Sequence, residues 1–416
     1  MVRPQQTLRA HSDFRKLWSG QTVSTFGSLI GRIALPMMAV LVLNATPMQV
    51  GLLRAVEVAP GLVAGLFAGL WVDRLRRRPL LIAADAGRAL LTAAIPALFL
   101  AGSLRMSGLY LVACLTSVLT ILFDVAYQAY LPTLVDSEAL VDANSRLEAT
   151  SAVAEVTGFG IAGVLVQTLT APLTILIDAV SFVVSAFSIL WIRTPEPPPP
   201  PPEQREGTWV EIRTGMTALF AHPVLRALAV AGGIHNLFGN IIGTVIMLYV
   251  LRELNLSPSL SGVIFAIGGI SSFVGALLAG SVVRQLGQGP AIVTTALMGA
   301  LASVFMPLAR GPLVVVVACL VAQQLLGDGA LTVYAIHATS LRQAITPERL
   351  LGRVSATLRV SDWAFMLLGT LLGGVLGELI GLRGALWVAT AGQLLSVVWL
   401  WFSPVRTLRG FDAGIR

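Results

Sequence analysis

The sequence of 416 residues has little charge, and almost all of its positive charge is arginine. Charged residues make up 12%, against about 25% in a typical soluble domain. Hydrophobic residues make up 56%, and the mean hydropathy is +0.82. This composition excludes an ordinary soluble domain and indicates a polytopic membrane protein. Lys16 is the only lysine, which excludes a GxxxxGK[ST] phosphate loop and a Schiff-base lysine inside the membrane.

Cysteine and histidine are also scarce. Cys114 and Cys319 both lie in apolar runs, which argues against a structural disulfide. The four histidines lack metal-site spacing, and no G-x-S-x-G elbow is present. We therefore expect no metal, no cofactor and no enzymatic activity. We interpret the net charge of +7 as a signal of membrane topology and not of nucleic-acid binding.

Twelve apolar segments are long enough to cross a membrane, which takes about 20 residues. They cover residues 18–43, 48–72, 79–101, 107–132, 146–169, 172–193, 226–251, 257–284, 289–309, 312–338, 353–380 and 382–403. Most arginines between the segments fall on one side, so the positive-inside rule places both termini in the cytoplasm. The first residues lack the pattern of a cleavable signal peptide.

A proline run divides the twelve segments into six and six. It reads TPEPPPPPPEQREGTW and should form an extended spacer. We predict an N-terminal bundle at 1–193, a linker at 194–225 and a C-terminal bundle at 226–416. Within the linker, Trp209 and Met216 share one helical face with other apolar residues. This stretch is either an interfacial helix or an ordinary linker helix.

The two halves of the sequence match each other at an offset of about 211 residues. HSDFRKL from His11 aligns with HPVLRAL from His222, and GLWVDRLRRRP from Gly69 aligns with GSVVRQLGQGP from Gly280. A third match follows in the same order. These matches predict two six-helix halves descended from one unit, which is a known transporter architecture.

On these residues the chain resembles the major facilitator superfamily. The stretch from Gly69 is similar to that superfamily's loop signature between spans two and three, G-x-L-a-D-r-x-G-r-[RK]-x-x-l. The matching residues are Gly69, Asp73, Arg74, Arg77 and Arg78. More narrowly, DFRKLWSGQTVSTFG, FDVAYQAYLPTLV and LIDAVSFVVSA resemble the branch that contains macrolide-efflux proteins and the enterobactin exporter.

The resemblance implies an all-α polytopic membrane protein with twelve transmembrane helices in two pseudo-symmetric six-helix bundles, the major facilitator fold. It implies a monomer in the bacterial cytoplasmic membrane that exports drug-like or secondary-metabolite solutes by alternating access, by proton antiport. The alternatives are siderophore export, proton-independent facilitation, and a membrane sensor or scaffold that moves no solute. The expected partners are a small-molecule substrate, protons and membrane lipid.

The loop signature has two interpretations. Its arginines either only set the topology, or, as the resemblance implies, the loop latches the cytoplasmic face against span eleven. The N-terminus of span eleven, near Gly352, would attract the carboxylate of Asp73. The second half has Arg284 at the equivalent position, so the latch should be one-sided.

Charges inside lipid are costly, so charged residues within spans should face protein or water. Asp85 and Arg88 are three residues apart on one helix and should pair. Asp124, at a similar depth in the next antiparallel span, should meet them. The group is either a neutral structural ion pair or a proton-responsive network.

The second half contains a sequence motif similar to the one around Asp124. FDVAYQAY and GDGALTVY predict that Asp124 and Asp328 are pseudo-symmetric carboxylates. Arg359 and Asp362 are expected near Asp328, and Asp362 joins the proton-coupling candidates.

Other charged residues within spans, Arg32 and Asp178 among them, are expected to be buried and to stand more alone. We expect buried, isolated carboxylates at Glu57 and Glu155, which makes them proton-coupling candidates, since burial favours the neutral form of a carboxyl group. Asp178 is expected to be structural. The substrate-cavity candidates are Arg32, His235, Asn236 and Asn240. The last three could equally form hydrogen bonds between helices.

Overall fold

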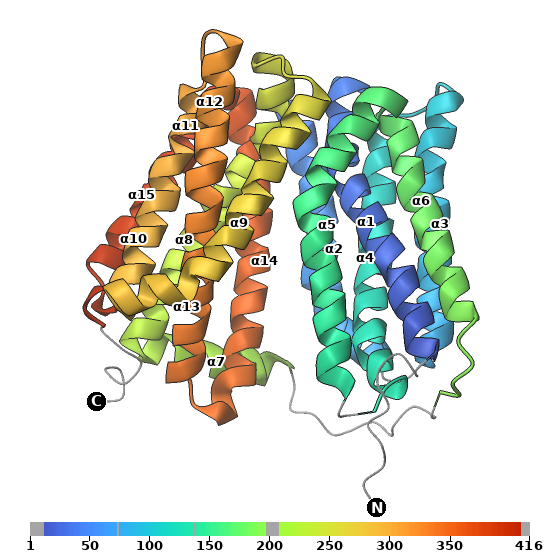
Figure 1. The fold of residues 1–416 in the computed structure, drawn as a ribbon, viewed down its shortest axis with the longest axis horizontal. Coiled ribbons are helices and arrows are strands. Elements are labelled where there is room, and N and C mark those ends of the chain that lie inside the picture. Colours follow the sequence, from blue (N-terminus) through green and yellow to red (C-terminus); the bar gives the residue numbers. More distant parts are fainter. Residues whose placement is uncertain (1–11, 73–74, 137–138, 197–207, 409–416) are drawn as a thin grey trace, which may run out of the picture. The chain divides into compact units, whose positions relative to one another are not determined.

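The computed structural model is helical throughout its regular structure and describes residues 12–72, 75–136, 139–196 and 208–408 (Figure 1). The helices of the first half are α1 (Ser12–Leu41), α2 (Pro47–Val72), α3 (Arg77–Leu100), α4 (Met106–Tyr130), η2 (Leu131–Thr133), α5 (Leu140–Leu169) and α6 (Ala171–Leu190). Those that follow are α7 (Thr208–Ala221), α8 (Pro223–Leu248), η4 (Tyr249–Glu253), α9 (Pro258–Leu286), α10 (Gln288–Ser303), α11 (Phe305–Leu308), α12 (Leu313–Gln323), η5 (Gln324–Asp328), α13 (Gly329–Ile345), α14 (Glu348–Leu379), α15 (Gly381–Trp401) and η6 (Pro404–Thr407).

Each predicted membrane segment coincides with a helix or with a run of consecutive helices. In the described chain, eleven such stretches are long and apolar enough to cross a membrane. They do not include α2, where the surroundings of residues 63–72 lie outside the description. Several helices begin before the predicted apolar run; α1 starts at Ser12 and α5 at Leu140. Hydropathy marks the apolar part of a helix, whereas the helix itself continues through a polar first turn.

The chain forms two compact units. The first contains residues 1–44 and 56–204, and the second contains residues 45–55 and 205–416. Helix α2 therefore contributes its first turns to the second unit and the rest to the first. This division differs at α2 from the predicted bundle boundaries, which assign the whole of span two to the N-terminal bundle.

In the first unit, α1 packs against α5 and α6, and α3 packs against α4 and α6. The core at one end of this unit joins Phe14 and Leu17 of α1 to Leu81 of α3 and Tyr130 of α4, all without solvent exposure. These residues come from helix ends that antiparallel neighbours bring together. The packing fixes the first turn of α1 against the start of α3.

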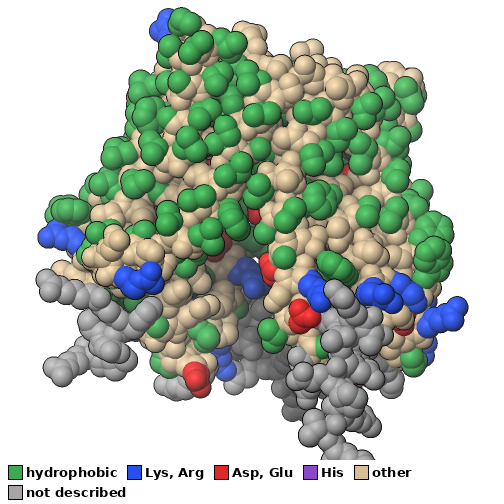
Figure 2. Space-filling view, viewed as in Figure 1, with side chains coloured by type: hydrophobic (Ala, Val, Ile, Leu, Met, Phe, Trp, Pro, Cys, Tyr) green, Lys and Arg blue, Asp and Glu red, His purple; other side chains and the backbone are tan. Residues whose placement is uncertain are grey.

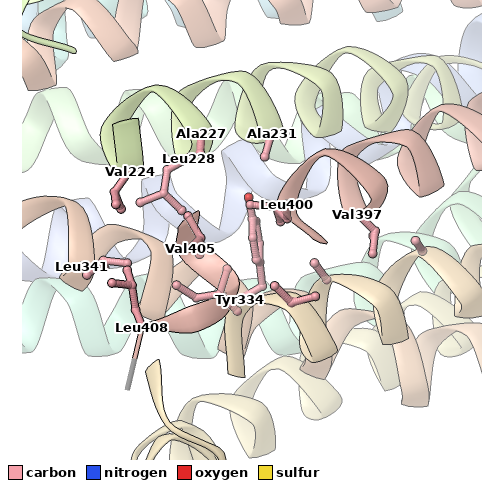
Figure 3. Packing of buried hydrophobic residues seen from close by; sticks show 14 residues of the cluster. Val224, Ala227, Leu228, Ala231, Tyr334, Leu341, Val397, Leu400, Val405 and Leu408 are labelled. Atoms are coloured by element: carbon pink, nitrogen blue, oxygen red, sulfur yellow. The ribbon is translucent and has the colours of Figure 1, made fainter. Parts of the chain in front are cut away.

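In the second unit, α8 packs against α14 and α15, and α13 packs against α9 and α10. Figure 3 shows the core where these helices meet, with Tyr334 of α13 among Leu228 of α8 and Leu400 of α15. Val405 and Leu408, which follow α15, pack against this core. The segment after α15 is thus part of the folded unit.

The helix predicted in the linker is α7, which packs against α14. Its Leu219 is buried with Leu225, Val354 and Leu358. Two other apolar residues of α7 are about half exposed, Met216 at 44% and Phe220 at 46%. The side chains of Trp209 and Ile212 lie outside the described residues. Exposed apolar residues beside a packed face suit a helix at the membrane surface, and that interpretation stays a prediction.

Figure 2 shows how side chains are distributed over one face of the molecule. Hydrophobic side chains cover its upper part, and most visible Lys and Arg side chains lie in its lower part. An apolar surface bounded by arginine is expected of helices that cross a bilayer.

Candidate functional site

The buried charge of the first unit is centred on Arg88 of α3. The guanidinium donates a hydrogen bond to Asp85, one turn earlier on the same helix. Both residues are buried, with exposed fractions of 4% and 0%. The structure therefore contains the predicted ion pair. The guanidinium carbon also lies 4.2 Å from the ring centroid of Phe123 and 4.4 Å from that of Phe182, where the ring faces attract a cation.

Asp178 of α6 is a second carboxylate near Arg88, with which it interacts electrostatically. It is 8% exposed and accepts a hydrogen bond from Ser28 of α1 at 3.2 Å. A Cβ on Gly31 would lie 2.3 Å from its Oδ2, so α1 needs glycine there to admit the carboxylate. The expectation that Asp178 stands alone was wrong, because the packing of α6 on α1 and α3 brings it to Arg88.

Asp124 of α4 also interacts electrostatically with Arg88, but its side chain is exposed. The expected direct meeting is not seen, since the hydrogen bond of Arg88 goes to Asp85 on its own helix. Phe123, the neighbour of Asp124, occupies the face of α4 that reaches the guanidinium. Three carboxylates thus lie around one arginine, a formal charge of −3 + 1 = −2 if all are ionised.

Two polar atoms of this cluster have further bonding capacity. Among the described residues, Oδ2 of Asp85 and Nε of Arg88 are buried without a hydrogen-bond partner. Buried polar atoms are normally satisfied, so such a pair marks either a functional site or an ordered water. We call Asp85, Arg88, Asp124 and Asp178 the Arg88 cluster.

Three further candidates of the first unit lie elsewhere. Arg32 of α1 and Glu155 of α5 have exposed side chains, so the expectation that they are buried was wrong. Both lie on the face of their helix that turns away from the core of the unit. Glu57 of α2 is half-buried, and its backbone carbonyl accepts a hydrogen bond from Ser117 of α4 at 2.6 Å.

The described part of the loop signature is tied to the first unit. Gly69 lies in α2, whereas Asp73 and Arg74 lie outside the described residues. Arg77 and Arg78 begin α3, and their backbone N–H groups donate to the carboxylate of Glu196. The Arg78 guanidinium donates to the carbonyl of Leu190 at 2.8 Å. These residues join the start of α3 to the end of α6.

Asp328 in the second unit lies at the end of η5, a π turn between α12 and α13. Its Oδ1 accepts a hydrogen bond from Gln323 at 3.4 Å. A Cβ on Gly268 of α9 would lie 2.1 Å from its Oδ2, so α9 approaches the carboxylate through glycine. Among the described residues, no cation forms an ion pair with Asp328. Single π turns inside long helices frequently mark functional sites.

The remaining candidates of the second unit form a polar group between α8 and α14. Asn236 donates to the backbone carbonyl of Asp362 at 3.3 Å, and Asn240 donates to the side chain of Asn236 at 2.6 Å. The ring of His235 lies 5.9 Å from that of Tyr334. The hydrogen bond from Asn236 to the carbonyl of Asp362 joins α8 to α14. It is the interhelical hydrogen bond that we expected as the alternative to a role in the substrate cavity.

Asp362 and Arg359 do not form the expected surroundings of Asp328. Both have exposed side chains on α14, and Asp362 lies with Asn236 of α8. Asp328 packs instead with α9 and with Gln323. The π turn directs its carboxylate toward α9, a change that helix periodicity could not predict.

Comparison with known proteins identifies the family. A model of the Major Facilitator Superfamily matches residues 17–356. The chain belongs to this superfamily. It is a multi-pass membrane protein of a family of secondary transporters, not an enzyme.

Two curated relatives cover nearly the whole chain. The multidrug efflux pump Tap of Mycolicibacterium fortuitum is 26% identical, over 91% of this chain and 92% of its own. The uncharacterized MFS-type transporter y4rN of Sinorhizobium fredii (strain NBRC 101917 / NGR234) is 26% identical, over 90% and 92%. The narrower resemblance to the macrolide-efflux and enterobactin-exporter branch stays a prediction.

Solved structures share the superfamily fold. An inward-facing bacterial homologue of the iron transporter ferroportin has a TM-score of 0.74 at 18% identity, covering 95% of this chain and 99% of its own. The nucleoside transporter NupG has a TM-score of 0.73 at 13% identity, covering 94% and 98%. At these identities the likeness concerns the fold alone.

A feature that sequence reasoning missed is the contact of the first turns of α2 with α14 in this transporter. A Cβ on Gly51 would lie 2.9 Å from the Cα of Gly374, so the two backbones touch. The Met48 N–H donates to Glu378 at 3.3 Å, and Arg252 donates to the carbonyl of Ala45 at 2.8 Å. The glycines within these two spans, Gly51 and Gly374, were the available signal. We call this contact the α2–α14 seam.

Proposed function

We propose that this transporter exports lipophilic, drug-like or secondary-metabolite solutes in exchange for protons. We place it in the bacterial inner membrane as a monomer, with both termini in the cytoplasm. The similarity to Tap, a multidrug efflux pump, supports efflux. The observation that carries proton coupling is the Arg88 cluster, which holds three carboxylates and one cation.

The charge balance of the cluster gives the physical reason. Arg88 forms its ion pair with Asp85. The carboxylates of Asp124 and Asp178 therefore have no cation of their own within the cluster. Asp178 is buried, where an uncompensated charge costs several kcal/mol, whereas Asp124 is exposed and accessible to protons from water. A proton is the smallest cation that can offset such a charge. Binding and release of protons at Asp124 and Asp178 would supply the exchange.

Asp328 is the corresponding candidate in the second half. Its hydrogen-bond partner is an uncharged amide, so a proton is again the simplest compensating charge. Asp328 lies fifteen residues after the start of α12 at Leu313, and Asp124 lies eighteen after the start of α4 at Met106. The pseudo-symmetric pairing of these two aspartates stays part of the proposal.

Exposed charged residues within the spans support a water-filled route. Arg32, Asp124, Glu155 and Asp362 are all exposed, although each lies within a membrane-spanning helix. A charge at that depth is far less costly in a water-filled cavity than in lipid. We assign these residues to the walls of the transport route, together with His235, Asn236 and Asn240. Glu57 stays a candidate for proton coupling beside Glu155.

Alternating access requires contacts that open and close. We assign the α2–α14 seam to one gate, because glycine backbones in contact can separate without leaving large side chains unpacked. The latch at Asp73 and Arg74 is proposed for the opposite end. Arg77 and Arg78 would hold the loop in place by anchoring the start of α3 to α6.

The proposal is tested in proteoliposomes that contain the purified transporter and a pH-sensitive dye inside. A panel of lipophilic drugs and siderophores is added outside, and proton movement is recorded with and without an imposed pH gradient. Substrate-dependent proton counterflow for a drug supports the proposal. Solute flux that does not depend on the pH gradient would identify a facilitator. The absence of flux with every compound tested would favour a sensor or scaffold.

Siderophore export is kept as a second candidate because Arg32 is exposed within α1. An exposed arginine inside a span suits an anionic substrate. In the same assay, Arg32→Gln should abolish counterflow with siderophores if they are the substrate. It should leave counterflow with cationic drugs intact. The double variant Glu57→Gln, Glu155→Gln should change the rate and pH dependence of an antiporter but not those of a facilitator.

A further inference from the structure

An open groove of about 820 Å³ lies at the end of the first unit where α1 and α3 begin and α6 ends. Three cations line it: Lys16 of α1, Arg78 of α3 and Arg193, which follows α6. Trp191 lines it as well and is 69% exposed. The groove belongs to neither the Arg88 cluster nor the α2–α14 seam, and it shares Arg78 with the anchor of the proposed latch loop.

The carboxylates near the groove are already occupied by internal donors. Asp13 accepts hydrogen bonds from Lys16, from the backbone N–H groups of Arg193 and Thr194, and from the Thr194 hydroxyl. Glu196 caps the start of α3. With Asp13 as its one acidic lining residue, the groove keeps a formal charge of +3 − 1 = +2.

Two of the cations are held in position by the end of α6. Lys16 donates to the carbonyl of Trp191 at 2.9 Å, and Arg78 donates to the carbonyl of Leu190 at 2.8 Å. These bonds use part of each group's donor capacity, since an ammonium has three N–H donors and a guanidinium has five. The guanidinium of Arg193 is exposed. The groove therefore has fixed donors and one adaptable donor for an anion.

An apolar stripe on α6 leads away from the groove. Its exposed side chains recur at helical spacing along the whole helix, at Leu173, Leu176, Val180, Val183, Phe187 and Leu190. These residues span about 26 Å at 1.5 Å per residue, close to the thickness of a bilayer's hydrocarbon core. A ligand that fits both features has an anionic head and long apolar chains.

We infer that this groove binds the headgroup of an anionic phospholipid whose acyl chains lie along α6. The phosphate would bind Lys16, Arg78 and Arg193, and the indole of Trp191 would lie at the level of the headgroup. Basic pockets between transmembrane helices are known to bind anionic lipid headgroups, and tryptophan is enriched at the membrane interface. The lipid would brace α1, α3 and α6 where they meet.

The test uses the purified, delipidated full-length protein in detergent. Phosphatidylglycerol, phosphatidylcholine or inorganic phosphate is titrated in, and the thermal midpoint and the lipid retained in native mass spectrometry are recorded. Arg193→Gln is the test variant. Arg105→Gln is its matched control, because Arg105 is an exposed arginine of the same unit at the start of α4.

Phosphatidylglycerol should raise the midpoint of the wild type and be retained, and phosphatidylcholine should do neither. Arg193→Gln should weaken phosphatidylglycerol binding about fivefold, the factor that corresponds to about 1 kcal/mol for one arginine near an anionic surface. Arg105→Gln should not weaken it. Equal effects of the two lipids, equal effects of the two variants, or full stabilisation by inorganic phosphate alone would each overturn the inference.

Discussion

The first unit offsets its buried carboxylates with a cation, whereas in the described part of the second unit no cation pairs with Asp328. Asp85 and Asp178 lie near Arg88, whose guanidinium is held between two aromatic rings. Asp328 in the second unit has a glutamine as its donor and a glycine of α9 against its carboxylate. The two halves match each other in sequence, but the carboxylates within their helices have different partners: a cation in the first half and an uncharged amide in the second. Proton binding is therefore expected to depend on different groups in each half.

The largest expected effect comes from removing the cation of the first unit. Arg88→Leu leaves Asp85 buried without its partner. Breaking a buried ion pair typically costs about 3–5 kcal/mol of stability. We expect a large fall in the thermal midpoint measured in detergent, or loss of folded protein from the membrane.

The control for this prediction removes both charges. Asp85→Leu combined with Arg88→Leu should recover part of the lost stability, because no buried charge of this pair is left alone. A double variant as unstable as Arg88→Leu would show that Arg88 acts through its aromatic contacts with Phe123 and Phe182. In that case the contrast between the two units would concern packing and not charge.

The second prediction concerns the close helix approach beside the π turn. A Cβ on Gly275 of α9 would lie 2.3 Å from the carbonyl oxygen of Gly329. Because that neighbour is backbone, Gly275→Ala should cost about 1–3 kcal/mol in thermal unfolding, the usual cost of overpacking. Gly243→Ala is the control, since its Cβ would meet no atom within 4 Å. Equal effects of the two substitutions would contradict this account.

The third prediction asks which unit couples protons to transport. Asp328→Asn keeps the shape of the side chain but removes its charge. We expect the pH gradient to accelerate drug efflux about tenfold less than in the wild type, within the usual range for coupling between two sites. Asp178→Asn is the parallel variant in the first unit. If neither variant changes the response to the gradient, the proposed coupling groups are wrong.

The smallest effect is expected at the position equivalent to the latch in the second half. Arg284 is exposed, and its guanidinium donates to Ser281 one turn earlier. Arg284→Gln should leave the thermal midpoint and transport almost unchanged, within about 0.5 kcal/mol. Asp73→Asn should slow transport several-fold more. Equal losses in both variants would show that the latch is two-sided.

The sequence was sufficient for the helices and for contacts within one helix. Long apolar runs separated by arginine gave the spans, because only a helix satisfies its backbone within a single segment in lipid. The ion pair of Asp85 and Arg88 followed from helix periodicity, which is the same in every protein. The division of the chain between residues 204 and 205 falls within the predicted linker, whereas the assignment of the first turns of α2 to the second unit was not foreseen.

The sequence could not predict which face of each span packs against protein and which faces lipid or water. A span is apolar on the side that meets lipid and on the side that meets protein, so the pattern of hydrophobicity does not say which side is buried. For this reason Arg32 and Glu155 were expected to be buried, and Asp178 was expected to be isolated. The rotation of each helix about its axis is set by packing, here by small residues such as Gly31 that admit a polar neighbour.

The sequence by itself determined the superfamily, the succession of long apolar helices and the pairing of charges one turn apart. Local propensity, hydropathy and helical spacing act along the chain and need no partner. Only the tertiary structure brought Asp178 to Arg88, turned Asp328 toward α9 through a π turn, and joined Asp13 and Glu196 to the helix ends beside the proposed lipid groove. Those contacts join residues far apart in the chain, and the close packing of whole helices decides them.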